Sequence, residues 1–243
     1  MIKVKGLSLE LGRRQVLRDV GLEVAAGETV ALMGASGSGK SILARAVVGL
    51  VKPDGGQVWL DGEEVTGSGA ARLREIRRKV GMLFQQNALF DSMTVKENIG
   101  FVLREVMGLS DAEIGARVTE LLERLHLGPI ERMYPSELSG GMKKRVGIAR
   151  AVAHEPRIVI YDDPTAGLDP ITSEAIGELI AELGQRTDRA VLMVSNYLPL
   201  IMATADRVLL LHQGRIIRLG APADIFTSER TELREFLDSN GEG

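Results

Sequence analysis

Cysteine is absent from this chain of 243 residues, which excludes disulfide bonds, zinc–thiolate sites and thiol nucleophiles. A chain without cysteine fits a reducing compartment such as the cytosol. Long apolar runs are also missing, since even the segment 200–211 is interrupted by Asp206 and Arg207. No window approaches the roughly 18 uncharged apolar residues of a membrane span. We therefore expect that the chain does not itself cross a membrane.

An excess of basic residues is missing as well. The chain has 30 Lys and Arg against 33 Asp and Glu, a net charge of -3, which argues against nucleic acid as a partner. One basic segment is the exception, with Arg72, Arg74, Arg77, Arg78 and Lys79. It could bind nucleic acid, but a solvated helix face fits an acidic chain better.

The most informative stretch is the glycine-rich octapeptide Gly34-Ala35-Ser36-Gly37-Ser38-Gly39-Lys40-Ser41. It follows an apolar run typical of a buried strand and precedes a helical pattern, which is the order that a phosphate-binding loop needs. Glycines let backbone N–H groups converge on an anion, and the helix N-terminus adds positive dipole. We expect Lys40 to bind the β- and γ-phosphates of a nucleoside triphosphate and Ser41 to bind Mg²⁺. An ordinary flexible glycine turn is the alternative.

Strand and helix patterns follow a definite order along the chain. Alternating strands over 2–33 are typical of an antiparallel sheet. Helical patterns then occupy 94–107, 111–126 and 139–153, with Ser110 as an N-cap. Aliphatic strands at 157–161, 190–194 and 208–211 alternate with helices at 171–186 and 198–204, before a strand at 215–219 and a helical tail at 222–238. This alternation favours a mostly parallel central sheet.

Two acids, Asp162 and Asp163, end the apolar strand pattern at 158–161. A carboxylate at the end of a strand beside a phosphate loop is where Mg²⁺ is held, so Asp162 is the predicted metal ligand, directly or through water. Asp163 is then placed to orient or deprotonate the attacking water. The alternative is that both acids cap the next helical turn.

A second anion site is predicted where Ser139 opens a helix as its N-cap, followed by Gly140 and Gly141. It lies about a hundred residues after the first site. A second phosphate-binding helix end has no use within one nucleotide site. It has a use if two chains share the nucleotide.

In order and spacing, five stretches resemble the nucleotide-binding domain of ABC transporters. They are Gly34–Ser41, the strand end at Gln85, Leu-Ser-Gly-Gly-Met at 138–142, Tyr-Asp-Asp-Pro at 161–164 and Ala-Gly-Leu-Asp at 166–169. The resemblance covers essentially the whole chain. It implies an α/β P-loop NTPase fold, an ABC ATPase core with a mostly parallel sheet, an N-terminal antiparallel β-subdomain and an inserted helical subdomain.

On this resemblance residues 1–243 form a single ABC ATPase domain. The RecA-like core and the β-subdomain take about 1–86 and 154–220, and the helical subdomain about 87–153. A C-terminal helical tail takes 221–243.

The resemblance also implies that a second copy of the chain completes the site. Two copies pack head-to-tail with ATP and Mg²⁺ between them, and the phosphate loop of each faces Ser139, Gly140 and Gly141 of the other. Lys40, Gln85, Asp163 and Asn196 are implied for hydrolysis; Ser41, Gln85 and Asp162 for Mg²⁺; and Leu11, Ile42 and Asp169 for nucleotide binding beside the loop and the Ser139 site.

A transmembrane permease subunit is implied as the partner that responds to the motion of this dimer. It would hold the chain at the cytoplasmic face of the inner (plasma) membrane. Contact is expected in a groove near residues 86–104, where Leu89, Phe90, Met93 and Val95 face either a helix of the permease or the core of this chain.

Four residues depart from the family pattern. Leu11 replaces an aromatic residue that stacks on adenine, and Ile42 replaces a frequent hydroxyl residue. Asp163 stands where the family usually has Glu, so its carboxylate is about 1.5 Å shorter in reach, and a misplacement of about 1 Å can cost about a hundredfold in rate. Asn196 replaces a histidine; it can donate a hydrogen bond but cannot carry a positive charge. We infer that ATP binding is retained and that hydrolysis is slow.

Finer features resemble the Mla-type and plastid TGD-type ATPases, which move phospholipid between membranes with a permease and an MCE-domain lipid-binding protein. These features are the stretch 84–95, the stretch 135–142 with Met142 where most relatives have Gln, and Asp-Pro-Ile-Thr at 169–172. The alternatives are the ATPase of an importer for another small solute, a soluble ABC protein without a transport role, and a nucleotide-gated scaffold.

Overall fold

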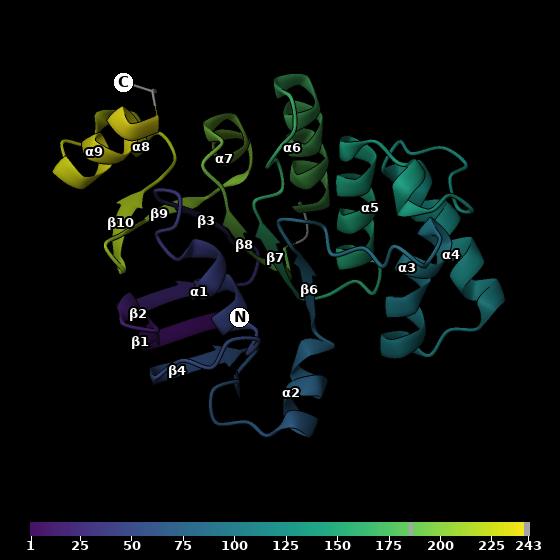
Figure 1. Cartoon of the computed structure of the whole chain (residues 1–243), viewed down its shortest axis with the longest axis horizontal. Helices are drawn as coiled ribbons and strands as arrows, with labels where there is room; N and C mark the ends of the chain where they lie inside the picture. Colours follow the sequence, from purple (N-terminus) through teal and green to yellow (C-terminus); the bar gives the residue numbers. More distant parts are fainter. Residues whose placement is uncertain (185–186, 241–243) are drawn as a thin grey trace.

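The computed structural model of the protein describes residues 1–184 and 187–240 (Figure 1). The last two residues of the predicted helix 171–186 and the end of the predicted tail lie outside these ranges. The predicted division into a core, two subdomains and a tail stays a prediction.

Two β-sheets organise the fold. The smaller is antiparallel between β1 and its neighbours and has the order β2 (Arg14–Val24), β1 (Ile2–Leu11), β4 (Gly55–Leu60), β5 (Glu63–Glu64). The larger has the order β10 (Arg215–Gly220), β9 (Arg207–His212), β3 (Thr29–Met33), β8 (Ala190–Val194), β7 (Ile158–Asp162), β6 (Val80–Leu83). Strands β9, β3, β8, β7 and β6 are parallel to one another, which confirms the predicted mostly parallel sheet.

The prediction of the first strands was wrong in detail. The predicted short strands at 2–4 and 7–11 are one continuous strand, β1, and β2 begins at Arg14 rather than at Val20. Register shifts between β1 and β2 at Leu7 and Leu9 let the strand continue through Gly6, whose φ is 60°. Strand β10 joins the larger sheet antiparallel to β9, so the parallel part ends at β9.

The helices cover both faces of the larger sheet. They are α1 (Lys40–Val47), α2 (Ala70–Arg77), α3 (Val95–Val102), the π-helical turn η1 (Leu103–Met107), α4 (Asp111–Arg124), the 3₁₀ turn η2 (Pro135–Glu137), α5 (Gly140–Val152), α6 (Pro170–Gly184), α7 (Leu198–Thr204), α8 (Asp224–Thr227) and α9 (Thr231–Asn240). Helix α1 and the smaller sheet lie on one face, and α5, α6 and α7 lie on the other (Figure 1). None of the described helices is long and apolar enough to span a membrane.

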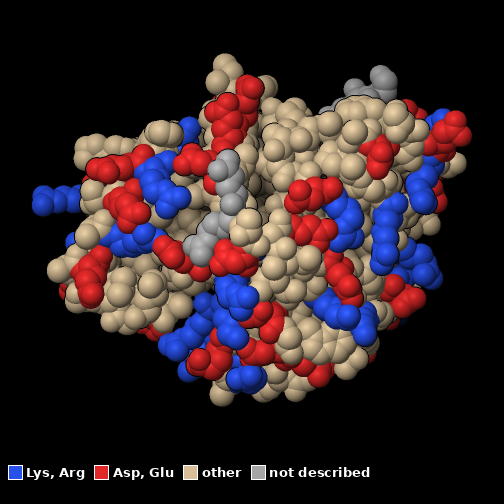
Figure 2. All heavy atoms as spheres, turned by 180° about the vertical axis from the view of Figure 1, so that it is seen from behind, with Lys and Arg blue, Asp and Glu red and all other residues tan. Residues whose placement is uncertain are grey.

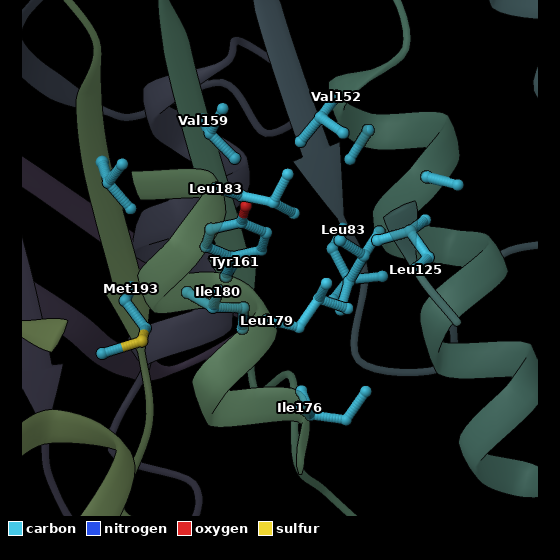
Figure 3. Close-up of a cluster of buried hydrophobic side chains, with 14 of the residues drawn as sticks. Leu83, Leu125, Val152, Val159, Tyr161, Ile176, Leu179, Ile180, Leu183 and Met193 are labelled. Carbon is cyan, nitrogen blue, oxygen red and sulfur yellow. The ribbon is translucent and has the colours of Figure 1, made fainter. Parts of the chain in front are cut away.

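Side chains alternate along the parallel strands between two hydrophobic cores. On β7, Val159 and Tyr161 point to the α5 and α6 side, whereas Ile158 and Ile160 point to the α1 side. Figure 3 shows the first of these cores, in which Tyr161 lies close to Ile180 of α6. Because both faces are covered, each strand is a nearly unbroken apolar run. This packing fixes the carboxyl ends of the strands, where the candidate site lies.

The helical segment between β6 and β7 begins its helices with side-chain caps. The predicted N-cap Ser110 is confirmed, and Thr94 forms the same reciprocal capping box with Glu97. The predicted helix 94–107 is α-helical only to Val102 and then widens into the π-helical turn η1. The predicted tail 222–238 is likewise divided, into α8 and α9.

Most cations of the basic segment around α2 have a partner within the chain. Arg72 lies 2.5 Å from Glu63 and Lys79 pairs with the same carboxylate, while Arg77 donates to the carbonyls of Val48 and Gly49. Acidic and basic side chains are interspersed over the face of the molecule in Figure 2. These contacts fit the interpretation of a solvated helix face.

Candidate nucleotide-binding site

The glycine-rich loop lies at the carboxyl end of β3, the strand between β8 and β9. Residues 34–39 form the loop, and α1 begins directly at Lys40. A ligand is bound most readily in this place in an open parallel sheet, outside the carboxyl ends of the strands. The predicted order of strand, loop and helix is therefore present.

At two positions of the loop only glycine fits. Gly34 has φ of 151°, and a Cβ there would lie 2.5 Å from the carbonyl oxygen of Leu211. Gly39 has φ of 109°, and its Cβ would lie 2.7 Å from a methyl group of Val16. The loop can therefore curl tightly over the start of α1 only with glycine at both positions.

Lys40 folds back over the loop it follows. Its Nζ donates to the carbonyl oxygens of Gly34, at 2.5 Å, and Ala35, at 3.1 Å. Burial lowers the pKa of Lys40, while the negative charges of Asp163 and Asp162 oppose that shift. The ammonium group thus lies above the first turn of α1, whose backbone N–H groups have no acceptor within the helix. This is the arrangement of a phosphate-binding site.

Ser41 and Asp162 meet beside Lys40. The Ser41 hydroxyl donates to Oδ1 of Asp162 at 2.7 Å. The carboxylate is fully buried, and its Oδ2 has no hydrogen-bond partner, as is also true of the Ser38 hydroxyl. Buried polar atoms without partners are rare and indicate a missing ion or ligand. A hydroxyl and a carboxylate fit Mg²⁺, which binds through few protein oxygens together with phosphates.

Asp163 follows in a left-handed conformation, with φ of 53°. Its N–H donates to the carbonyl of Val194 at 2.9 Å, and its own carbonyl accepts from the N–H of Ala166. Burial raises the pKa of the Asp163 carboxyl group, and the positive charges of Lys144 and Lys40 oppose that shift. A half-buried carboxylate with a raised pKa is a suitable proton acceptor for water.

Asn196 reaches the loop from the segment after β8. Its side-chain oxygen accepts a hydrogen bond from the N–H of Gly34 at 3.2 Å. Asn196 therefore binds the first residue of the loop and leaves its amide N–H₂ group as a donor. Four predicted residues, Lys40, Ser41, Asp163 and Asn196, thus lie at one edge of the sheet together with Asp162.

Gln85 lies near this edge as well, after β6, and is exposed. Its carbonyl accepts a hydrogen bond from Nζ of Lys144 at 2.8 Å. Lys144 itself was missed by the sequence reasoning. It precedes Ile148 by four residues and Ala151 by seven, so it stands on the buried face of a predicted helix, and that position was the available signal.

The phosphate loop opens into a cleft whose far end is lined by basic rather than aromatic side chains. A cleft of about 580 Å³ runs from residues 35–38 of the loop to Arg13, Arg14, Val16, Arg18 and residues 211–214. Leu11 is 49% exposed at the end of β1, beside this turn. Ile42 lies half-buried in α1 and packs against the core. The structure thus places an aliphatic side chain near the mouth of the cleft and arginines along its wall.

The predicted second anion site forms a separate cleft of about 560 Å³. Ser139 caps α5 by accepting from the N–H of Met142, and Gly141 packs so closely on α6 that a Cβ would lie 2.8 Å from Thr172. Thr172 donates to both carboxylate oxygens of Asp169, and these hydrogen bonds lower the pKa of Asp169. Ser139, Gly140, Gly141 and Asp169 line this cleft together, apart from the phosphate loop.

This fold and site define a P-loop nucleoside triphosphatase, with a second, separate cleft at the start of α5. Comparison with known proteins places it more closely. Residues 17–166 match the protein family described as ABC transporter. The chain is 42% identical to a methionine import ATP-binding protein MetN of Carboxydothermus hydrogenoformans, across 98% of this chain and 72% of that protein.

Two further similar proteins are also ATP-binding proteins. A probable ribonucleotide transport ATP-binding protein of Mycobacterium leprae is 36% identical, across 98% of this chain and 68% of that protein. The dimeric ATP-binding cassette MJ0796, in a post-hydrolysis state with ADP and Pi, superimposes with a TM-score of 0.83 and 33% identity, covering 90% of this chain and 97% of that one.

The chain belongs to the ABC transporter family. It is an ABC ATPase that binds ATP with Mg²⁺, and its fold is the ABC ATPase fold. The role of each individual site residue stays a prediction.

Proposed function

We propose that this chain drives a membrane permease by closing and opening as a head-to-tail pair around ATP. The observation that carries the proposal is an apolar groove of about 440 Å³ between β6, α3 and α5. It is lined by Met82, Phe84, Phe90, Phe101, Val102 and Val106, among others. The groove lies next to Gln85, so a partner bound there contacts the segment that leads into the ATP site.

Aromatic side chains give the groove its shape. Phe90 is 42% exposed and Phe101 40%, and their rings meet edge to face with centroids 5.4 Å apart. The Arg150 guanidinium lies 5.7 Å from the centre of the Phe90 ring. Exposed apolar side chains of this kind, beside a cation, suit the apolar face of an amphipathic helix from a partner. Of the two alternatives given for Val95, a partner helix or the core of this chain, the structure shows the second, because Val95 is fully buried.

Pairing of two chains is supported by the two separate clefts. Residues 35–38 of the phosphate loop line one of them, and Ser139 with Asp169 lines the other. The structural relative MJ0796 is a dimer with ADP and Pi. A closed pair with each loop facing the partner's Ser139 satisfies both phosphate-binding helix ends at once.

For the cargo, the sequence favours phospholipid, moved together with an MCE-domain protein. The features that support this are Met142 after the two glycines and the stretches 84–95 and 169–172. A second candidate is the import of a small solute such as methionine, favoured by 42% identity to a methionine import ATPase.

One experiment tests the permease and the cargo together. The tagged chain is purified in mild detergent from membranes of its source, and the proteins bound to it are identified. We expect a permease, and for the phospholipid proposal an MCE-domain protein with it. The complex is then placed in lipid nanodiscs, and its ATPase rate is measured with added phospholipid or methionine.

The outcomes separate the candidates. Stimulation by methionine alone contradicts the phospholipid cargo, and a chain recovered without any membrane protein contradicts the permease. Phe101→Asp is the matched variant, since it puts a charge into the groove far from the phosphates. It should lose the permease and keep ATP binding.

A further inference from the structure

A buried lysine lies between Gln85 and Asp163 of the candidate site. Lys144, on α5, is only 2% exposed. Its ammonium group donates to the carbonyl oxygen of Gln85 at 2.8 Å and to that of Asp163 at 3.3 Å. Lys144 therefore contacts the two segments that are predicted to surround the γ-phosphate.

The two carbonyls lie just beyond the ends of two neighbouring strands. Leu83 of β6 pairs with Tyr161 of β7 in a parallel register, and Gln85 and Asp163 each follow two residues later. The ammonium group thus bridges the carboxyl ends of β6 and β7.

Asp163 needs such support because of its backbone. A residue other than glycine is uncommon at φ of 53°, and it persists there only when its surroundings hold it. On one side, the N–H of Asp163 is bound by Val194; on the other, its carbonyl accepts from Lys144 and Ala166. These contacts determine how far the short carboxylate reaches toward the loop.

The segment after β6 is held on α5 by a second cation. Arg150, which is 9% exposed, donates to the carbonyls of Asn87 and Ala88, both at 2.8 Å. Asn87 and Ala88 are also in the left-handed region, with φ of 62° and 50°. Of these two cations, Lys144 also donates to Asp163. Lys144 therefore links the segment after β6 to the residue predicted to act in hydrolysis.

Packing does not explain a lysine here. Burial of an ammonium group costs free energy that a methionine of similar length would avoid. Burial lowers the pKa of Lys144, against the pull of the Asp163 and Asp162 charges. A residue that stays despite this cost has a use in its hydrogen bonds.

We propose that Lys144 is a positioning residue for ATP hydrolysis: its two hydrogen bonds fix the backbone of Gln85 and of Asp163 relative to the phosphate loop. It touches neither phosphate nor water itself. It acts after ATP has bound and the pair has closed. The inference holds for any cargo, and it rests on the predicted role of Asp163.

The test compares Lys144→Met with Lys143→Met in the full chain, with the permease bound. Both variants lose one positive charge from adjacent positions of α5. For Lys144→Met we expect kcat to fall about 10- to 100-fold, the effect of a misplacement near the reacting groups. The KM for ATP, the Kd of ATP and ATP-driven dimerisation should match the parent. Lys143→Met should keep the parental kcat.

A second variant, Lys144→Gln, guards against a chain that fails to fold. Its amide keeps N–H donors, so kcat should lie between those of the parent and Lys144→Met. If Lys144→Met unfolds, a folded Lys144→Gln with reduced kcat and unchanged Kd supports the inference. The inference is overturned if the variants that fold keep the parental kcat. It is also overturned if kcat, ATP affinity and melting temperature all fall together.

Asp163→Ala, measured in parallel, separates two kinds of failure. If it turns over ATP like the parent, the role of Asp163 is wrong and the inference on Lys144 is wrong with it. If it is inactive while Lys144→Met is fully active, only the inference on Lys144 is overturned.

Discussion

The side-chain oxygen of Asn196 accepts a hydrogen bond from the backbone N–H of Gly34, so the residue that replaces a histidine holds the start of the phosphate loop. Asn196 thus contacts the loop, and the predicted difference from the histidine of the family pattern is a missing positive charge. Asp163 is a second departure from the family pattern, because its side chain is one methylene shorter than that of glutamate and its carboxylate reaches less far. Together the two departures predict ATP binding with slow hydrolysis.

The first prediction restores both groups. Asp163→Glu combined with Asn196→His should raise kcat by about 10- to 100-fold, because a correction of about 1 Å in the position of a reacting group is worth about a hundredfold. Steady-state ATPase of the complex with its permease measures this. A parental turnover as fast as that of the double variant would contradict the idea that hydrolysis is slow.

The second prediction separates binding from hydrolysis. Asp163→Ala should abolish hydrolysis and leave an ATP-bound dimer, visible by size-exclusion chromatography. Lys40→Ala should abolish both, since the ammonium group that lies over the loop is the cation predicted to bind the phosphates. Dimerisation of Lys40→Ala with ATP as complete as that of Asp163→Ala would show that Lys40 is not needed for binding.

The third prediction concerns pH. Burial raises the pKa of Asp163, and only the ionised carboxylate accepts a proton, so kcat should fall as pH falls through this raised pKa. The acid limb should therefore lie above the ordinary titration range of aspartate, near pH 3.9. A kcat profile at saturating ATP measures it. Asn196→Ala should lower kcat without moving this limb; an acid limb near the ordinary aspartate range contradicts the role of Asp163.

How far the sequence predicts this site depends on whether a contact is local. The loop from Gly34 to Ser41 was fully predictable, because its glycines and the helix after it are neighbours in the chain. The meeting of Ser41 with Asp162 followed from the parallel order of strands. Each of these two sequence patterns is compatible with only one local structure.

Contacts made by a single long side chain were not predictable in this way. Lys144 looked like one of several polar residues in a helix, and only the packing of α5 against β6 shows that its ammonium group is buried. The left-handed backbone of Asp163 also left no local signal, since aspartate without glycine beside it does not announce a positive φ. The place of Val95 was left open between a partner helix and the core, because exposed and buried apolar residues give the same pattern in a short helix.

The fourth prediction concerns the base. Leu11→Tyr should tighten ATP binding about fivefold or more, because stacking of a base on an aromatic ring contributes roughly 1–3 kcal/mol. Isothermal titration with ATP measures this, and inorganic triphosphate, which has no base, is the control ligand. Equal tightening of both ligands would mean that the new ring does not contact adenine.

The last prediction concerns the groove. Asn98 is fully buried, and its side chain accepts from the N–H of Phe90 and donates to the carbonyls of Phe90, Met93 and Thr94. Asn98→Ala removes the partner of the Phe90 N–H and of the Met93 carbonyl, so the free energy of unfolding should fall by about 1–3 kcal/mol. Because the segment that presents Phe90 loosens, the permease should also bind more weakly while ATP binding is unchanged.

Asn98→Leu is the control for this variant, since it fills the same volume without hydrogen bonds. Urea unfolding gives the stability, and pull-down of the permease gives the binding. If Leu restores both to the level of the parent, the hydrogen bonds of Asn98 contribute nothing and packing alone shapes the groove. If Leu fails like Ala, the amide fixes Phe90 where a helix of the permease would meet it, next to Gln85 and the ATP site.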